Sequence, residues 1–237
     1  MLKLILLIFA KAIITFAFAE PFFDEIKTPV TTEARNPFLV GIGLTLTAAL
    51  SRDSTGEPLQ KDISEDQPLG SWSKFGDLMG LLIPNAVYYG SMKTHFYISK
   101  SEESNLNAQI MFKATLYTQL VTQILKYSTR ESRPNRKDRK SFPSGHTSSA
   151  FAFASSVGAI HGWEWGIPAY AVATFVGISR MNDNAHWLHD VIGGAAIGIG
   201  YGLGITYLYK KEKINSDLTI YPILKKDTSG LALNYSF

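Results

Sequence analysis

The apolar positions of this chain gather in stretches of helical length, and through the first 209 residues they do not follow the two-residue alternation of a strand. Several of these stretches are rich in Gly, Ala, Ser and Thr, which suits close packing between helices. In chain order they cover residues 36–51, 75–92, 106–127, a helix beginning near Ser144, 167–178 and 187–209. The pattern predicts an all-α fold, a helical bundle of about six helices.

Polar stretches separate the first of these segments from its neighbours. Residues 51–70 combine charged side chains with Gly, Pro, Ser and Asp, and we expect a loop there. Residues 20–36 contain prolines and mixed polarity and are expected at the surface.

The last residues change period. From residue 230 to 237 apolar and small or polar side chains alternate, and residues 218–224 form a plausible partner across a turn at 225–230. This predicts a short C-terminal β-hairpin. A strand that ends in an aromatic residue is similar to the last strand of outer-membrane barrels, but one hairpin cannot close a barrel. We therefore expect it to pack on the helical bundle.

The first nineteen residues resemble a secretory signal. Lys3 precedes an apolar region, and Ala17-Phe18-Ala19 fits a cleavage site before Glu20, although Lys11 interrupts the apolar run. The alternative is an uncleaved interfacial or anchoring helix. Both place the rest of the chain outside the cytoplasm, in the periplasm or at the periplasmic face of a bacterial envelope.

These patterns divide the chain into four parts. They are a signal peptide at 1–19, an N-terminal segment with one apolar helix and a polar loop at 20–74, a catalytic helical bundle at 75–209, and a tail at 210–237. Residues 191–209 form an uncharged run of nearly the 20 residues that a membrane span needs. The mean hydropathy of +0.03 leans toward a soluble or peripheral protein. Membrane association, up to embedding, stays open at this stage.

Composition and charge narrow the chemistry. The 237 residues include no cysteine, which removes disulfides, thiolate nucleophiles and cysteine metal sites. The formal net charge is +3, yet residues 130–140 alone carry six basic and two acidic residues, a net of +4. The rest of the chain therefore sums to −1, and its basicity is local.

The basic loop opens the first of three candidate segments. Lys126 ends an apolar helix, and Arg133 follows seven residues later, before a proline that disfavours helix. A lysine and an arginine that converge on one point suit a multiply charged oxyanion.

The second and third segments bring a helix start and two histidines. Ser144 is a good N-cap, and Gly145 allows a ligand to approach the free N–H groups of a helix that begins there. His146 would lie beside a bound anion. In the third segment, Arg180 precedes His186, and Asp190 follows four residues after this histidine, which places the pair on one helix face. A carboxylate there fixes the imidazole tautomer and leaves the other nitrogen free to attack.

Together the three segments resemble the signature of the type 2 phosphatidic acid phosphatase family, whose superfamily includes bacterial acid phosphatases and vanadium-dependent haloperoxidases. The resemblance covers residues 75–209, and every signature position is present in order: Lys126, Arg133 and Pro134; Pro143, Ser144, Gly145 and His146; Ser179, Arg180, His186 and Asp190. It implies three groups of roles. Phosphate binding would fall to Lys126, Arg133, Ser144, Gly145 and Arg180. Nucleophilic attack would fall to His186, oriented by Asp190, and leaving-group protonation to His146.

The resemblance implies a metal-independent phosphatase with no cofactor. It would hydrolyse a phosphomonoester or diphosphate, lipid-linked or a small phosphate ester, through a phosphohistidine, and vanadate would occupy its phosphate site as an inhibitor. Two alternatives remain open: a vanadate-dependent haloperoxidase, and a non-catalytic envelope protein that binds lipids or anions.

Other charged residues compete for roles. His186 and His189 could form a metal pair, but the sequence supplies no further ligand at suitable spacing, so we expect no metal, and His189 either structural or at the rim of the site. A cluster beside the motifs matches no signature position, and we expect it to attract a lipid headgroup or substrate and not nucleic acid: Arg136, Lys137, Arg139 and Lys140. Trp163 and Trp165 would lie at a headgroup layer or at the core edge.

Overall fold

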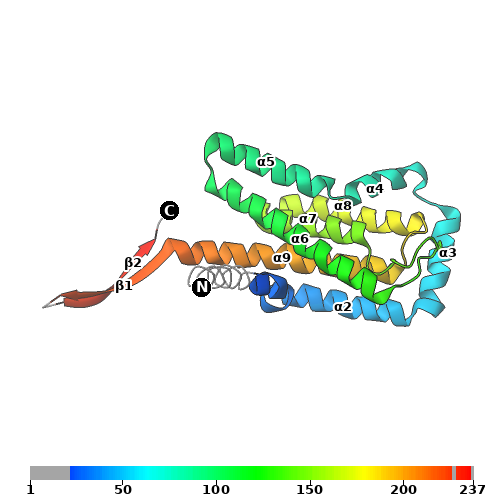
Figure 1. The fold of residues 1–237 in the computed structure, drawn as a ribbon, viewed down its shortest axis with the longest axis horizontal. Coiled ribbons are helices and arrows are strands. Elements are labelled where there is room, and N and C mark those ends of the chain that lie inside the picture. The colour runs from blue at the N-terminus through cyan, green and yellow to red at the C-terminus, as the bar shows by residue number, and fades with distance from the viewer. Residues whose placement is uncertain (1–21, 226–227, 236–237) are drawn as a thin grey trace, which may run out of the picture.

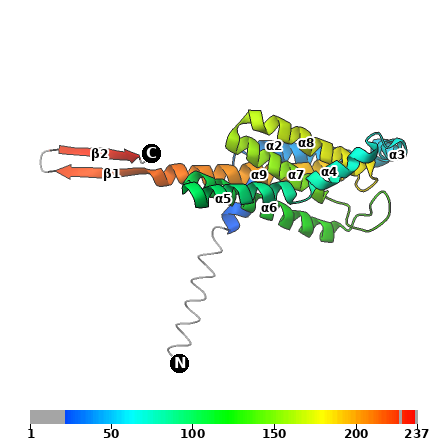
Figure 2. The same ribbon diagram turned by 90° about the horizontal axis from the view of Figure 1, so that it is seen from above.

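The structure is a computed structural model that describes residues 22–225 and 228–235, with side chains described up to residue 213. The described chain is an elongated bundle of nine α-helical segments that ends in a β-hairpin (Figures 1 and 2). Residues 22–31 form its first helix. The others are α2 (Arg35–Leu50), α3 (Glu57–Asp66), α4 (Ser73–Gly80), α5 (Ile83–Ser99), α6 (Glu102–Thr129), α7 (Gly145–His161), α8 (Trp163–Asn182) and α9 (Leu188–Asp217). The all-α class is therefore confirmed, with more helices than the six expected.

The central helix is α9, which packs against α2, α6 and α7. Small residues let α7 and α9 approach so closely that a Cβ atom on Gly198 would lie 2.5 Å from the Ser148 carbonyl oxygen. On the other side of α9, the core joins aliphatic and tyrosine side chains of α6 and α9: Ile110, Ala114, Tyr117, Ile197, Tyr201 and Ile205. The apolar run of α9 is long because this helix has neighbours on several sides and buries most of its surface against them.

The outer surface of the bundle is unusually apolar. On α6 one exposed stripe repeats every four residues, and α2, α5 and α8 carry exposed apolar side chains as well. The stripe consists of Phe112, Leu116, Leu120 and Ile124. Among the described residues, one helical stretch, Leu188–Lys213, is long and apolar enough to cross a membrane by length and composition, and 61% of its most apolar window is buried inside the protein.

Two sequence expectations for the N-terminal half are wrong. The polar stretch 51–70 is not a loop: it holds a π-helical turn, η1 (Arg52–Gly56), then α3, and a short 3-10 turn, η2 (Gly70–Trp72). Pro58 lies in the first turn of α3, where a missing N–H costs nothing, and the buried Gln60 side chain donates to the Met181 carbonyl at 2.8 Å. The single helix expected over 75–92 is two helices, because Leu81 adopts an extended conformation and α5 begins at Ile83, with Pro84 in its first turn.

The C-terminal end of the chain forms the expected hairpin, and the N-terminal end is not described. The expected signal at 1–19 lies outside the described residues. At the other end β1 (Leu218–Lys225) and β2 (Thr228–Tyr235) pair antiparallel, with Leu218 opposite Tyr235, so the second strand starts at residue 228 and not at 230. The hairpin continues from α9 and extends away from the helices, so the expectation that it packs on the bundle is wrong (Figures 1 and 2).

Candidate active site

The three signature segments meet at one end of the bundle, the end that α3 closes and that lies opposite the hairpin (Figure 1). The last turn of α6 holds Lys126, the first turn of α7 holds His146, and the connection from α8 to α9 holds His186. The loop 130–144 runs between α6 and α7 and brings Arg133 to the same place. The helical topology therefore gathers residues that are up to 64 positions apart in the chain.

His186 is almost fully buried, and each of its ring nitrogens has one partner. Its Nε2 atom lies 3.1 Å from the Arg133 guanidinium, and its Nδ1 atom lies 3.4 Å from Asp190 Oδ2. A guanidinium only donates, so Nε2 accepts and the neutral ring carries its proton on Nδ1, toward the carboxylate. This tautomer leaves the Nε2 lone pair directed at the cationic side of the site. Burial lowers the pKa of His186 to about 4, more than Asp190 raises it, so the ring is neutral at pH 7.

Asp190 is fully buried and organises the start of α9. The expectation that His186 and Asp190 share a helix face is wrong in detail, because α9 begins only at Leu188. Asp190 instead reaches back as the third helical residue does in a capping box, and its Oδ2 accepts the Trp187 backbone N–H at 2.8 Å. The Ser141 hydroxyl donates to the same oxygen at 2.5 Å. Burial raises the pKa of Asp190, but His186, then the Ser141 hydroxyl and His189, outweigh this effect and hold the pKa below its usual value.

The cations of the first segment face this pair. Lys126 is 7% exposed, and its ammonium donates to the carbonyls of Lys140 at 2.8 Å and Ser141 at 3.2 Å. Burial, and then the charge of Arg133, lower the pKa of Lys126 to about 8. Arg133 is held from behind by Asp138, whose Oδ1 accepts its Nε–H at 2.9 Å. Both cations are therefore fixed in position before any ligand arrives.

The start of α7 lies against Lys126. Ser144 is the N-cap and accepts from Thr147, while a Cβ on Gly145 would meet the Lys126 side chain at 3.7 Å. The free N–H groups of this helix start are thus presented beside an ammonium, which is the geometry of an anion site. The expected N-cap role of Ser144 is confirmed.

On the far side, Asp77 of α4 joins His146 to Arg180. One Asp77 oxygen lies 3.1 Å from His146 Nε2 and 2.5 Å from Arg180 Nη1, and Asp183 accepts from Nη2 of the same arginine at 2.8 Å. Burial and the Arg180 charge lower the pKa of His146, and Asp77 offsets this only in part. Lys126 and Arg133 lower it too, so all three cations act on this histidine.

Several residues of the site were missed by sequence reasoning. Asp77 and Ser141 contact catalytic candidates, and Arg52 stacks on the Trp187 ring at 4.1 Å. No sequence signal identified them, since their partners lie tens of residues away. Of the basic cluster, Lys140 lies over the Tyr127 ring at 4.7 Å and contacts its hydroxyl, at the exposed edge of the site.

His189 and Asp190 also belong to a group of possible cation ligands. Among the described residues, the group that could hold a cation does not include His186 and consists of Glu131, His189 and Asp190, with ligand atoms within 4.8 Å of one another. The Arg52 guanidinium lies 3.0 Å from Glu131 Oε1, so a positive charge already occupies one side of this group.

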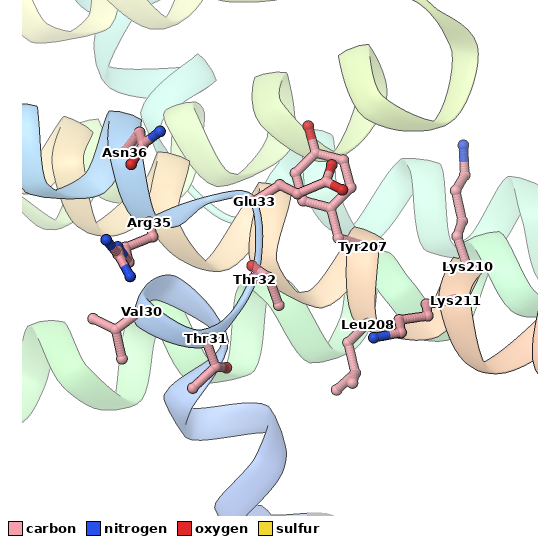
Figure 3. A pocket seen from close by; sticks show the side chains of 10 residues that line it. All are labelled: Val30, Thr31, Thr32, Glu33, Arg35, Asn36, Tyr207, Leu208, Lys210 and Lys211. Carbon is pink, nitrogen blue, oxygen red and sulfur yellow. The ribbon is translucent and has the colours of Figure 1, made fainter.

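A cavity of about 800 Å³ lies at the opposite end of the bundle, between the start of α2 and the later turns of α9 (Figure 3). Its side chains include Glu33, Arg35 and Lys211. Seventeen helical residues separate Tyr207, which lines it, from Asp190, a rise of roughly 26 Å. It contains none of the signature residues and is not the candidate active site.

This arrangement of three cations, a helix start and a buried histidine–carboxylate pair within a helical bundle has the charge and the donors that suit an oxyanion. Residues 108–214 match the PAP2 superfamily. A lipid A 1-phosphatase from Porphyromonas gingivalis is 44% identical over 81 residues, which cover 32% of this chain and 18% of that protein. The chain thus spans about a fifth of the length of this curated relative.

Two solved structures match the chain. Aquifex aeolicus LpxE has a TM-score of 0.51 and 22% sequence identity, covering 67% of this chain and 96% of its own. The first transmembrane PAP2 type phosphatidylglycerolphosphate phosphatase structure, from Bacillus subtilis, has a TM-score of 0.42 and 23% identity, covering 81% and 94%. The first of these supports the bundle architecture.

Proposed function

We propose that this protein is a PAP2-type phosphatase that hydrolyses a phosphomonoester or diphosphate through a phosphohistidine on His186. One observation carries the proposal. The Nε2 lone pair of a buried, neutral His186 faces the Arg133 guanidinium at 3.1 Å, while Asp190 holds the opposite nitrogen. A nucleophile aimed at a cation is aimed at the place where a phosphoryl oxygen would bind.

The cradle supplies the charge that phosphoryl transfer requires. Lys126, Arg133 and Arg180 neutralise the equatorial oxygens, and the N–H groups at the start of α7 add partial positive charge. Three fixed cations take the place of the metal ions that other phosphatases use, so the reaction is proposed to need no metal.

The chemical steps balance as follows. His186 Nε2 attacks phosphorus, a phosphorus–nitrogen bond forms, and the bond to the leaving oxygen breaks as His146 gives that oxygen a proton. The charge of a bound phosphate raises the pKa of His146, which offsets the lowering by burial and Arg180 and makes the ring an acid. Water then attacks phosphorus, His146 takes its proton, and the phosphorus–nitrogen bond breaks to release phosphate.

The proposed substrate is a phosphorylated lipid. The exposed apolar stripe on α6 and the apolar faces of α2, α5 and α8 are too extensive for a surface that meets only water, and they suit association with a membrane. Trp163 and Trp165 are 72% and 65% exposed at the start of α8, which favours the headgroup layer over the core edge. The relative named a lipid A 1-phosphatase supports the same class of substrate. We propose the periplasmic face of the envelope as its location.

A substrate panel tests this function. Phosphate release from phosphatidic acid, phosphatidylglycerol phosphate, an isoprenyl diphosphate, lipid A and p-nitrophenyl phosphate is measured with and without EDTA, vanadate and the His186→Ala change. We expect turnover of at least one lipid, no effect of EDTA, inhibition by vanadate, and no turnover or acid-labile phosphoenzyme in His186→Ala. Full activity of His186→Ala contradicts the mechanism. Peroxide-dependent bromide oxidation with vanadate, without phosphate release, identifies a haloperoxidase, and phosphate binding without any turnover identifies a binding protein.

A further inference from the structure

A second histidine, His189, lies behind the nucleophile pair and has no role in the proposed steps. It is 4% exposed, and its Nε2 atom lies 2.9 Å from Glu131 Oε1 and 3.4 Å from Asp190 Oδ1. Its ring also stacks on Phe142, with the centroids 6.0 Å apart. A carboxylate only accepts, so Nε2 carries a proton, which it donates to Glu131 while Asp190 Oδ1 lies close by.

The two carboxylate oxygens of Asp190 accept different numbers of hydrogen bonds. Oδ2 receives the Ser141 hydroxyl and the Trp187 N–H and faces His186. Oδ1 is buried without a hydrogen-bond partner among the described residues, and His189 Nε2 at 3.4 Å is the charged or polar neighbour that the structure places beside it. A buried carboxylate oxygen left without positive neighbours is costly, so the group would turn to share its donors. His189 opposes that rotation.

His189 is itself held by a chain of contacts that returns to the nucleophile. Glu131 accepts from His189 and from Arg52 Nη1 at 3.0 Å. Arg52 stacks on the Trp187 ring, and the Trp187 indole donates to the Ser132 carbonyl at 2.9 Å. The residue next to His186 and the residue next to Asp190 are thus tied to the same loop.

We propose that His189 is a positioning residue, which fixes the Asp190 carboxylate through Oδ1 so that Oδ2 stays on His186, and that Glu131 and Arg52 hold His189 in place. The inference rests on the proposed function, because it assigns a role within that reaction. His189 acts through Asp190 and does not touch the phosphate.

The test uses the full-length protein and the panel substrate with the highest turnover. His189→Ala is expected to lower kcat by about 10- to 100-fold, the range known for groups that orient a metal ligand from behind, with KM changed less than twofold. His189→Gln keeps an N–H donor near the same position and is expected to recover kcat to within about threefold of the unchanged protein. The matched control is His95→Ala, which removes an exposed histidine of α5 whose Nδ1 atom contacts the Ser104 hydroxyl, far from the site. It should leave kcat unchanged.

A double-mutant cycle addresses the support of His189. Glu131→Ala as a single change is expected to lower kcat. In the His189→Ala background it should have little further effect, because both substitutions remove the same Glu131–His189 contact. Additive losses contradict the chain of contacts.

A second readout needs no turnover. In protein labelled with 15N-histidine, the His186 signals should report the Nδ1–H tautomer in the unchanged protein and in His189→Gln, and a mixture of tautomers in His189→Ala. The inference is wrong if folded His189→Ala keeps both its kcat and its tautomer. It is also wrong if EDTA removes activity and Zn²⁺ restores it only when His189 is present, since the group would then hold a metal. Absence of turnover in the unchanged protein contradicts the proposed function alone, because the tautomer measurement still decides the role of His189.

Discussion

Replacing Gly194 with alanine tests whether the close approach of α7 and α9 builds the active site. Gly194 lies in the second turn of α9, one turn after Asp190, against the start of α7. A Cβ atom there would lie 2.6 Å from the Ser144 carbonyl oxygen and 3.3 Å from the Ser148 nitrogen. These are backbone atoms, so they cannot turn aside as a side chain does.

The magnitude follows from that distance. Ordinary contact begins at 3.4 Å, so the two helices must separate by about 0.8 Å at this point. Overpacking of this kind costs about 1–3 kcal/mol, and the better helix propensity of alanine returns up to about 1 kcal/mol. We expect a net loss of about 1–2 kcal/mol, or about 2–8 °C in Tm for a chain of this size. The same shift moves Ser144 and Gly145 away from His186, and a displacement near 1 Å costs up to about 100-fold in kcat.

Thermal unfolding and phosphate release measure the two effects separately. The matched control is Gly90→Ala in α5, where a Cβ would meet nothing within 4 Å. It is expected to leave kcat unchanged and to leave Tm unchanged or slightly higher. If Gly194→Ala has the same Tm and kcat as Gly90→Ala, the helices are not in the contact described here and the reasoning is refuted.

Three further predictions concern the pH dependence of activity, the proposed general acid His146, and Glu25 at the far end of the bundle. In the pH profile of kcat/KM, activity should fall below about pH 4, where His186 gains a proton, and above about pH 8, where Lys126 loses a proton. A flat profile between pH 3 and 10 contradicts both assignments. Asp77→Asn removes the carboxylate that raises the pKa of His146, so kcat at pH 7 should fall several-fold. KM should fall as well, because the anion site has lost one negative charge. A rise in KM would argue against this placement of Asp77. Glu25→Ala removes a buried carboxylate that accepts two tyrosine hydroxyls and one lysine, and should lower the free energy of unfolding by about 2–4 kcal/mol in denaturant titrations with kcat preserved.

The candidate site could be predicted largely because its residues belong to short segments of fixed spacing. Ser144 begins α7 because N-capping is local, and the adjoining Gly145 and His146 follow from it. The geometry of the nucleophile pair was predicted less well. A spacing of four suggests one helix face, but His186 precedes α9 and meets Asp190 through a capping interaction.

The contacts around the signature residues required the fold. Asp77 reaches Arg180 across 103 positions, and Arg52 reaches Glu131 across 79. Neither pair has a spacing that a local rule could detect, because each is set by how α4 and η1 pack on the rest of the bundle. The same holds for α3: its polar sequence has the composition of a loop, and it is helical because Gln60 finds buried partners near the end of α8.

The amino-acid sequence by itself determined the helical class of this protein, the concentration of positive charge in residues 130–140, and the chemical identity of the groups at the site. Helix periodicity, N-capping and residue type are local properties, so they can be read without knowledge of packing. Only the tertiary structure decided which nitrogen of His186 faces Arg133, which partners each Asp190 oxygen contacts, and that the apolar helices leave an exposed apolar surface. Those features depend on the distances between separate helices, which are set by close contacts such as that of Gly194 with Ser144.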